Sequence, residues 1–141
     1  MSDNEVFAQL STEAALELMG TEQLGRVVVR RSDDMDIFPV NFVVDGGAIY
    51  FRTSEGNKLF SLSLNNDVLF EADHVDLDNH DAWSVIVKGT AEVLQDAAAI
   101  HHADSLDLTP WLPTLKYNYV KITPNSVSGR KFHLGEEPQR Y

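Results

Sequence analysis

The 141-residue sequence predicts a mainly β protein, an antiparallel barrel with a few short helices. Three observations predict this class: six to seven short runs rich in β-branched and aromatic residues, few and short helical patterns, and a strong hairpin signal at Asp45-Gly46-Gly47. A closed antiparallel barrel also removes the exposed edges that short β runs would otherwise leave unpaired.

The first part of the chain predicts one helix and three strands. Ser11 is a suitable N-cap for a short helix through Met19, and Gly20 is a typical stop. The strands follow at 26–30, 37–44 and 48–53, with a turn at 32–36. Because Pro39 has no N–H to donate, its strand should lie at an edge, or be bulged or bent, at that point.

The second part predicts two helices and four strands. A helix capped by Asn57 covers 57–66, and another covers 96–106. Strands are predicted at 68–73, 82–94, 116–122 and 126–134, with a polar loop at 74–81 and a rigid loop at 109–113. Gly89 indicates a bend or bulge in its strand.

Composition limits the class of protein. We expect a single domain over 1–141, with its core at about 24–132 and a flexible polar C-terminal tail. The formal charge of −11 argues against nucleic-acid binding, and the lack of cysteine excludes disulfides and thiolate metal sites. We see neither a secretory signal nor an apolar run long enough for a bilayer, so a cytoplasmic protein without a membrane role is expected.

One segment departs from this acidity. Residues 48–66 carry Arg52, Lys58 and a single carboxylate, a local balance of +1. Arg52-Thr53-Ser54 ends a strand, and a helix begins nearby, so hydroxyls, cations and free N–H groups can converge on one anion such as phosphate. The alternative is that Ser54 or Asn57 only caps the helix while the two cations are solvated.

The remaining polar and aromatic candidates have ordinary explanations. Trp83 and Trp111 are more often core or interface residues than cofactor contacts. Adjacent His101 and His102 point about 100° apart on a helix and cannot easily share a metal. The aspartates of 73–81 do not follow the calcium-loop pattern, so no metal site is predicted.

The order of several motifs resembles a known family. The segments "GRVVV", "FPVNFVVDGGAIYFRTSEGNKL", "DVLFEAD", "WSVIVKGTAEVL" and "VKITPNSVSGRKF", from Leu24 to Phe132, resemble the pyridoxamine 5′-phosphate oxidase-like flavin-binding split barrels. Within them the chain is most similar to the compact branch that includes nitroimidazole-resistance-type proteins. The resemblance implies a six-stranded antiparallel split barrel (Greek key) that forms a homodimer and binds FMN in two clefts between its subunits.

The resemblance also implies site residues. Thr53, Ser54 and Lys58, with Arg52 beside them, lie where the family holds the FMN phosphate. The strand beside the flavin ring, and further contacts from either subunit, would come from Pro39, Val40, Asn41, Phe42, Trp83, Ser84 and Arg130. No catalytic side chain is identified, which is consistent with a flavin enzyme because the ring carries the electrons.

The chain departs from true pyridoxamine phosphate oxidases at two places. Leu59 stands where they have a second basic residue after Lys58, and the tail "RKFHLGEEPQRY" lacks their spacing of Arg and His. We therefore expect a flavin-dependent oxidoreductase that acts on a small molecule other than a B6 vitamer, with NAD(P)H as a possible donor. The alternatives are a non-catalytic flavin-binding or flavin-sequestering protein, and the same barrel holding a deazaflavin or haem.

Overall fold

A computed structural model describes residues 7–31, 33–53, 66–108 and 118–136 of the chain. Within these ranges seven strands and two helices are present. The strands are β1 (Phe7–Leu10), β2 (Leu24–Arg31), β3 (Asp34–Asp45), β4 (Ala48–Thr53), β5 (Asp67–Asp76), β6 (Asp81–Val93) and β7 (Asn118–His133). The helices are α2 (Thr12–Met19) and α3 (Ala97–Asp104).

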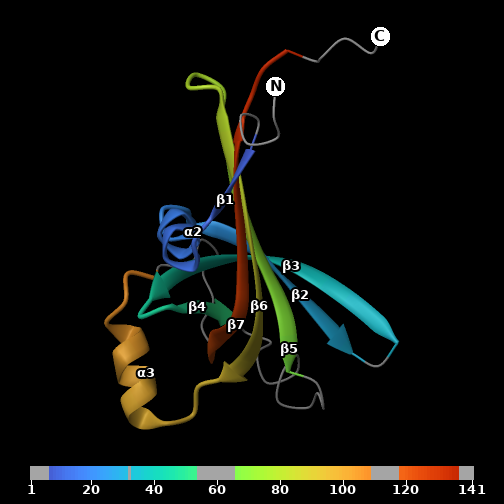
Figure 1. Cartoon of the computed structure of the whole chain (residues 1–141). Coiled ribbons are helices and arrows are strands. Elements are labelled where there is room, and N and C mark those ends of the chain that lie inside the picture. Colours follow the sequence, from blue (N-terminus) through green and yellow to red (C-terminus); the bar gives the residue numbers. More distant parts are fainter. Residues whose placement is uncertain (1–6, 32, 54–65, 109–117, 137–141) are drawn as a thin grey trace.

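The strands form one antiparallel sheet that closes on itself. Their order is β1-β7-β4-β3-β2-β5-β6, and β7 also pairs with β6 (Figure 1). Six strands from β2 to β7 therefore make a barrel, and β1 adds a short strand against the far end of β7. The predicted fold class, a six-stranded antiparallel split barrel, is confirmed.

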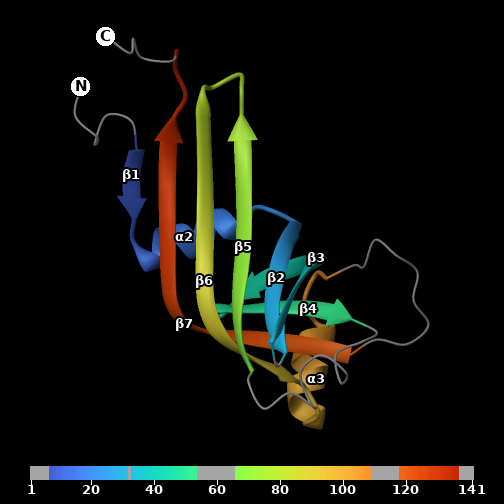
Figure 2. The ribbon, with the colours of Figure 1, turned by 90° about the vertical axis from the view of Figure 1, so that its right-hand side faces the viewer.

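One end of the barrel extends into a flat arm. The β5–β6 ladder runs from Asp67 opposite Thr90 to Asp76 opposite Asp81, and the β6–β7 ladder continues to Asp81 opposite His133. Figure 2 shows β5, β6 and β7 side by side in this arm, with β1 along the outer edge of β7. The arm carries α2 on one side, whereas α3 lies at the opposite end of the barrel (Figure 1).

The local signals explain the hairpins and helix starts. Gly46 and Gly47 have φ of 57° and 79°, so the β3–β4 turn uses the conformation that glycine adopts most easily. Ser11 accepts a hydrogen bond from the amide of Ala14, and Asp96 accepts one from Ala99, which caps α2 and α3. The predicted turn at Asp45-Gly46-Gly47 and the predicted cap at Ser11 are confirmed, whereas the cap at Asp96 was not predicted.

Alternate strand residues fill the main core. Side chains on the inner face include Phe42, Phe51 and Phe70, and α2 adds Ala15 and Met19, both fully buried. The outer face of β4 packs separately. A second buried cluster lies there under α3 and consists of Ala48, Tyr50, Ala103, Leu108 and Tyr119.

Two predicted connections, a loop and a turn, are wrong in extent, and one strand was missed. The loop predicted at 74–81 is the β5–β6 hairpin, with only 77–80 between the strands, and the turn at 32–36 is shorter because β3 begins at Asp34. In the arm, pairing between β5 and β6 satisfies the backbone hydrogen bonds, so residues with polar side chains can form a strand there. The strand β1 has too few residues to give a periodic signal and was not predicted.

The two strands predicted at 116–122 and 126–134 are one continuous strand, β7. The register of the β6–β7 ladder shifts between Lys88 and Gly89, and the pairing skips Asn125. Pro124 stands next to this bulge, where the regular ladder is interrupted, so the strand can pass through a proline. The predicted irregularity at Gly89 is confirmed. Of the helix predicted at 57–66, only residue 66 is described. The loop predicted at 109–113 lies outside the described residues.

Candidate functional site

The stretch Pro39–Phe42 lies on β3 and pairs with β2 along one edge. Pro39 stands opposite Arg26, and the amide of Phe42 donates to the carbonyl of Gln23 at 3.1 Å. Because backbone groups alternate between the two edges of a strand, those of Pro39 and Asn41 face away from β2. The missing N–H of Pro39 therefore removes no hydrogen bond from the β2–β3 ladder. An edge, a bulge or a bend was expected at Pro39, and β3 is instead an interior strand between β2 and β4.

The other edge of β3 is where the barrel opens. The β3–β4 ladder runs from Asp45 opposite Ala48 to Phe42 opposite Phe51, and no further pair continues it among the described residues. Phe42 is 2% exposed and makes an edge-to-face contact with Phe70, their ring centroids 4.9 Å apart. The end of this ladder brings the Pro39–Phe42 stretch close to the last residues of β4.

Arg52 and Thr53 occupy that end of β4 and point to opposite faces of the strand. Arg52 follows Tyr50 on the outer face. Its Nη1 donates to the carbonyl of Leu108 at 3.4 Å, and its guanidinium lies 5.4 Å from the centroid of the Tyr119 ring. Thr53 follows Phe51 on the core-facing side and is partly buried. Ser54 and Lys58, the other predicted phosphate ligands, lie outside the described residues.

A cavity of about 520 Å³ lies beside this opening. Asn41 and Phe42 line it from β3, and Leu108, whose carbonyl binds Arg52, lines it from the opposite side. The structure thus places two residues of the predicted ring-binding stretch, Asn41 and Phe42, around one space with Leu108, the contact of Arg52. Pro39, Val40, Arg52 and Thr53 do not line this cavity. The lining also includes three carboxylates, those of Glu22, Asp45 and Asp107.

Trp83, Ser84 and Arg130 lie on the arm. Trp83 is 7% exposed, belongs to the main core and stacks on His74 with a centroid distance of 6.4 Å. Ser84 and Arg130 are cross-strand partners on the outer face, and Ser84 also stands opposite Asp73 of β5. The structure therefore separates Trp83, which packs inward, from its neighbour Ser84.

A charged cluster on the outer face was not predicted. Arg26, directly opposite Pro39, donates to Oε1 of Glu71 from Nε at 2.9 Å and from Nη2 at 2.6 Å, and Nη2 lies 3.0 Å from Oδ1 of Asp73. The cluster lies between Pro39, which is opposite Arg26, and Ser84, which is opposite both Asp73 and Arg130. Period-two alternation places each residue on the outer face, but the register that brings them together is not readable from the sequence.

The pKa values of all three charged groups in this cluster are shifted. The hydrogen bond to Glu71 raises the pKa of Arg26, so the guanidinium stays charged. Burial raises the pKa of Glu71, and the hydrogen bond with Glu71 lowers the pKa of Asp73. The pKa values of these two carboxyl groups are thus shifted in opposite directions.

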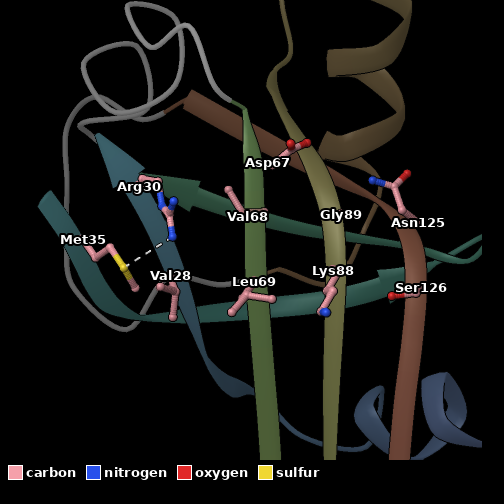
Figure 3. Close-up of a pocket in the computed structure, with 10 residues that line it drawn as sticks. All are labelled: Val28, Arg30, Met35, Asp67, Val68, Leu69, Lys88, Gly89, Asn125 and Ser126. Atoms are coloured by element: carbon pink, nitrogen blue, oxygen red, sulfur yellow. Dashed lines mark hydrogen bonds between the residues drawn. The ribbon is translucent and has the colours of Figure 1, made fainter. Parts of the chain in front are cut away.

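A second cavity, of about 450 Å³, opens on the outer face of β2, β5, β6 and β7 (Figure 3). Val28 and Leu69 form its apolar floor, and Lys88 stands beside them from β6. Arg30 lies at the β2 side, its Nη2 3.9 Å from the sulfur of Met35. None of the predicted cofactor residues lines this cavity.

The described residues contain no group of three His, Asp or Glu side chains placed to hold a metal ion. No described helix has the length and apolar character required to span a membrane.

Comparison with known proteins relates the chain to one family. The model of the pyridoxamine 5′-phosphate oxidase family matches residues 11–131. An uncharacterized protein of Mycobacterium tuberculosis H37Rv is 44% identical over 98 residues, which cover 70% of this chain and 87% of that protein.

Two solved structures are similar in sequence and fold. A Corynebacterium glutamicum protein, provisionally assigned as a pyridoxamine 5′-phosphate oxidase, is 61% identical, with a TM-score of 0.87 over 94% of this chain and 97% of that one. The structure described as the FAD binding protein from Mycobacterium smegmatis is 41% identical, with a TM-score of 0.78 over 91% of this chain and 100% of that one.

Proposed function

The chain belongs to the pyridoxamine 5′-phosphate oxidase family, and from this premise we propose that it is a flavoprotein, with FMN as its cofactor and a small molecule as its redox substrate. The observation that carries the proposal is the opening where β3 and β4 separate, with a cavity of about 520 Å³ beside it. The FAD bound by the 41% identical relative from M. smegmatis supports a flavin in this chain too.

The residues present fit such a cofactor. Pro39–Phe42 bring backbone to the open edge of β3, which suits the polar rim of a flavin ring. The side-chain amide of Asn41 lies beside it and donates to the carbonyl of Gln23 at 3.3 Å. The carboxylates of Glu22, Asp45 and Asp107 disfavour phosphate in the cavity itself, so the cavity suits the uncharged ring system.

The phosphate would lie at the end of β4. Thr53 supplies a hydroxyl there, and Ser54 and Lys58 follow it in the chain. Arg52 adds positive charge while its contacts with Leu108 and Tyr119 fix the strand end. Bound flavin would supply the electron or hydride transfer, and the protein would supply binding, orientation and exclusion of water.

We propose that a second copy of the chain completes the cleft. Large apolar side chains stand outward on β3, β5 and β6: Met35 is 58% exposed, Ile37 62%, Leu69 37% and Ile86 43%. In register, Ile37 lies opposite Val28, which lies opposite Leu69, so these residues form a continuous outer surface. Ser84 and Arg130 lie on the same face and would reach the partner's cofactor from there.

Spectroscopy and titration test the cofactor. Freshly purified protein should show flavin absorption, and protein stripped of cofactor should bind added FMN, with FAD tested in parallel. Lys58→Ala and Thr53→Val should each weaken FMN binding by about 1–3 kcal/mol, the usual range for a lost charge-assisted contact, whereas Lys131→Ala should not. Turnover with NAD(P)H and an acceptor would separate an enzyme from a flavin-binding protein without activity.

Colourless protein that takes up neither FMN nor FAD would refute the proposal. A haem or deazaflavin spectrum would keep the cleft but replace the cofactor.

A further inference from the structure

The outer face of the sheet carries opposite charges on two neighbouring strands. The outward residues of β2 are Arg26, Val28 and Arg30, and those of β5 are Asp67, Leu69, Glu71 and Asp73. In register, Val28 stands opposite Leu69 and Arg26 opposite Glu71. Arg30 and Asp67 follow at the end of the same ladder and line one cavity. A basic strip on β2 therefore lies beside an acidic strip on β5, with an apolar pair between the charges.

The same face has a projection and a hollow. The projection is Ile37 on β3, which is 62% exposed. The hollow is the cavity of about 450 Å³ over β5 and β6, with Leu69 in its floor and Lys88 beside it (Figure 3). One row of opposed residues crosses β3, β2, β5 and β6: Ile37, Val28, Leu69 and Lys88. Three strand spacings, about 14 Å, thus separate Ile37 from Lys88 within one chain.

We propose that a second copy of the chain packs on this face with the two-fold axis parallel to the strands, between β2 and β5. The proposal rests on the dimer of the proposed function and specifies its geometry. Rotation about this axis lays β2 of each copy over β5 of the other, and β3 over β6, with the rows matched. Arg30 then faces the partner's Asp67. Arg26 faces the partner's Glu71, and Ile37 enters the partner's hollow.

The charges favour this direction of the axis. An axis across the strands would lay β2 on β2 and β5 on β5, so that guanidinium groups would face guanidinium groups and carboxylates would face carboxylates. With the axis parallel to the strands, each strip meets the opposite charge. Arg26 and Glu71 already pair within each chain at 2.6 Å, so the two copies together form an alternating group of cations and carboxylates. Lys88 faces β3, whose outward residues Met35 and Ile37 carry no charge.

This geometry also brings the partner to the flavin cleft. Asn41 lies opposite Leu24 at the end of β2, and Ser84 lies opposite Asp73 on the other side of the sheet. The β2–β5 register places these two pairs in one row. Since β3 lies over the partner's β6, the open edge of β3 faces the partner's Ser84. The second copy therefore closes the cleft with β6.

Introduced cysteines test the geometry directly, because the chain contains none of its own. The double variant Ile37→Cys, Lys88→Cys is oxidised and run on a non-reducing gel. A disulfide needs Cα atoms within about 7 Å, which these positions do not meet in one chain, so a covalent dimer is the expected product. Neither single variant should crosslink, since each position lies far from its own counterpart. The matched control Ile37→Cys, Leu77→Cys, with its second cysteine at the hairpin tip, should not crosslink either.

Charge reversal tests the two strips independently. Arg30→Glu and Asp67→Lys should each raise the dissociation constant of the dimer at least about tenfold, as measured by light scattering. An equimolar mixture of the two variants should form mixed dimers in native mass spectrometry, because the reversed strips then complement each other. A pairing within one chain would not produce this recovery. Circular dichroism establishes that each variant is folded.

The outcomes are distinct. A double-cysteine variant that gives no covalent dimer would overturn the proposal, and so would a mixture of the charge variants without mixed dimers. Crosslinking of Ile37→Cys alone would place the axis across the strands and overturn it as well. If the charge variants fail to fold, the cysteine variants decide. Flavin absorption and FMN titration of the unmodified chain test the cofactor separately, so failure of this geometry is distinguishable from failure of the proposed function.

Discussion

Gly25 supports the strand proposed to bind the flavin ring, and Gly25→Ala should destabilise the protein. A Cβ at Gly25 would lie 2.5 Å from Cζ and 2.7 Å from Cε1 of Phe70, and 3.0 Å from the carbonyl oxygen of Glu71. Carbon atoms in contact normally lie about 3.5–4.0 Å apart, so the ring would have to move by about 1 Å. Phe70 is fully buried and packs edge-on against Phe42, which leaves it no free direction.

The expected cost follows from this overpacking. Extra atoms in a filled core typically cost about 1–3 kcal/mol. For a domain of this size 1 kcal/mol lowers the melting temperature by about 3–4 °C, so we expect Gly25→Ala to melt about 3–12 °C lower. Because the displaced ring touches Phe42, the variant should also bind FMN more weakly.

Thermal unfolding followed by circular dichroism measures the effect. Gly135→Ala is the matched control, because a Cβ there meets no atom within 4 Å, and it should melt within about 1 °C of the unmodified chain. The double variant Gly25→Ala, Phe70→Leu should cost less than the sum of the two single variants, since a smaller side chain makes room for the methyl group. A Gly25→Ala protein as stable as the Gly135→Ala control would refute this account of the packing.

Two further predictions concern charge and assembly. Hydrogen bonds from Asn79 lower the pKa of Asp76, so Asp76 contributes stability above its ordinary pKa of 3.8, and this contribution is lost as the pH falls through the lower folded-state value. In the Asp76→Asn variant the melting temperature should therefore fall less steeply as the pH is lowered below about pH 4. If the melting temperature of this variant falls as steeply as that of an Asp33→Asn control, the prediction is contradicted. Ile37→Asp should convert the proposed dimer to monomer in light scattering, because it places a charge in the outer apolar surface. Leu77→Asp, at the exposed hairpin tip, should leave the mass unchanged, and an unchanged mass for Ile37→Asp would place the interface elsewhere.

The sequence predicts those elements whose signals are local. The Asp45-Gly46-Gly47 turn and the Ser11 cap depend on a few neighbouring residues, and both are present in the structure. Pro39 likewise indicates an interruption of regular pairing, because the missing N–H is a property of the residue itself, and the β3–β4 ladder does end before Pro39. None of these predictions requires knowledge of which strands pair with each other.

Features that depend on pairing over long distances could not be predicted. The four residues of β1 form a strand only because β7 offers them an edge, and Pro124 lies inside β7 only because the ladder is irregular beside it. The Arg26, Glu71 and Asp73 cluster depends on the register between β2 and β5. A shift of one residue would move these side chains to the other face, and nothing in the sequence alone fixes that register.

The predicted site is described in part. In the structure Asn41 and Phe42 line a cavity together with Leu108, whose carbonyl accepts from Arg52. The resemblance implied that these segments bind the cofactor, but it could not give the position of the cavity. Thr53 turns to the opposite face of β4 from Arg52, although the two are adjacent in the sequence.

The course of β7 has a consequence for biosynthesis. This strand, the last of the described chain, pairs with β1, β4 and β6, so residues made early must wait for residues made late. Contacts between such distant segments slow folding, and on the ribosome the barrel can close only once β7 has emerged from the exit tunnel. Until then β4 and β6 keep open edges, and the nascent chain is at its most vulnerable to association with other chains.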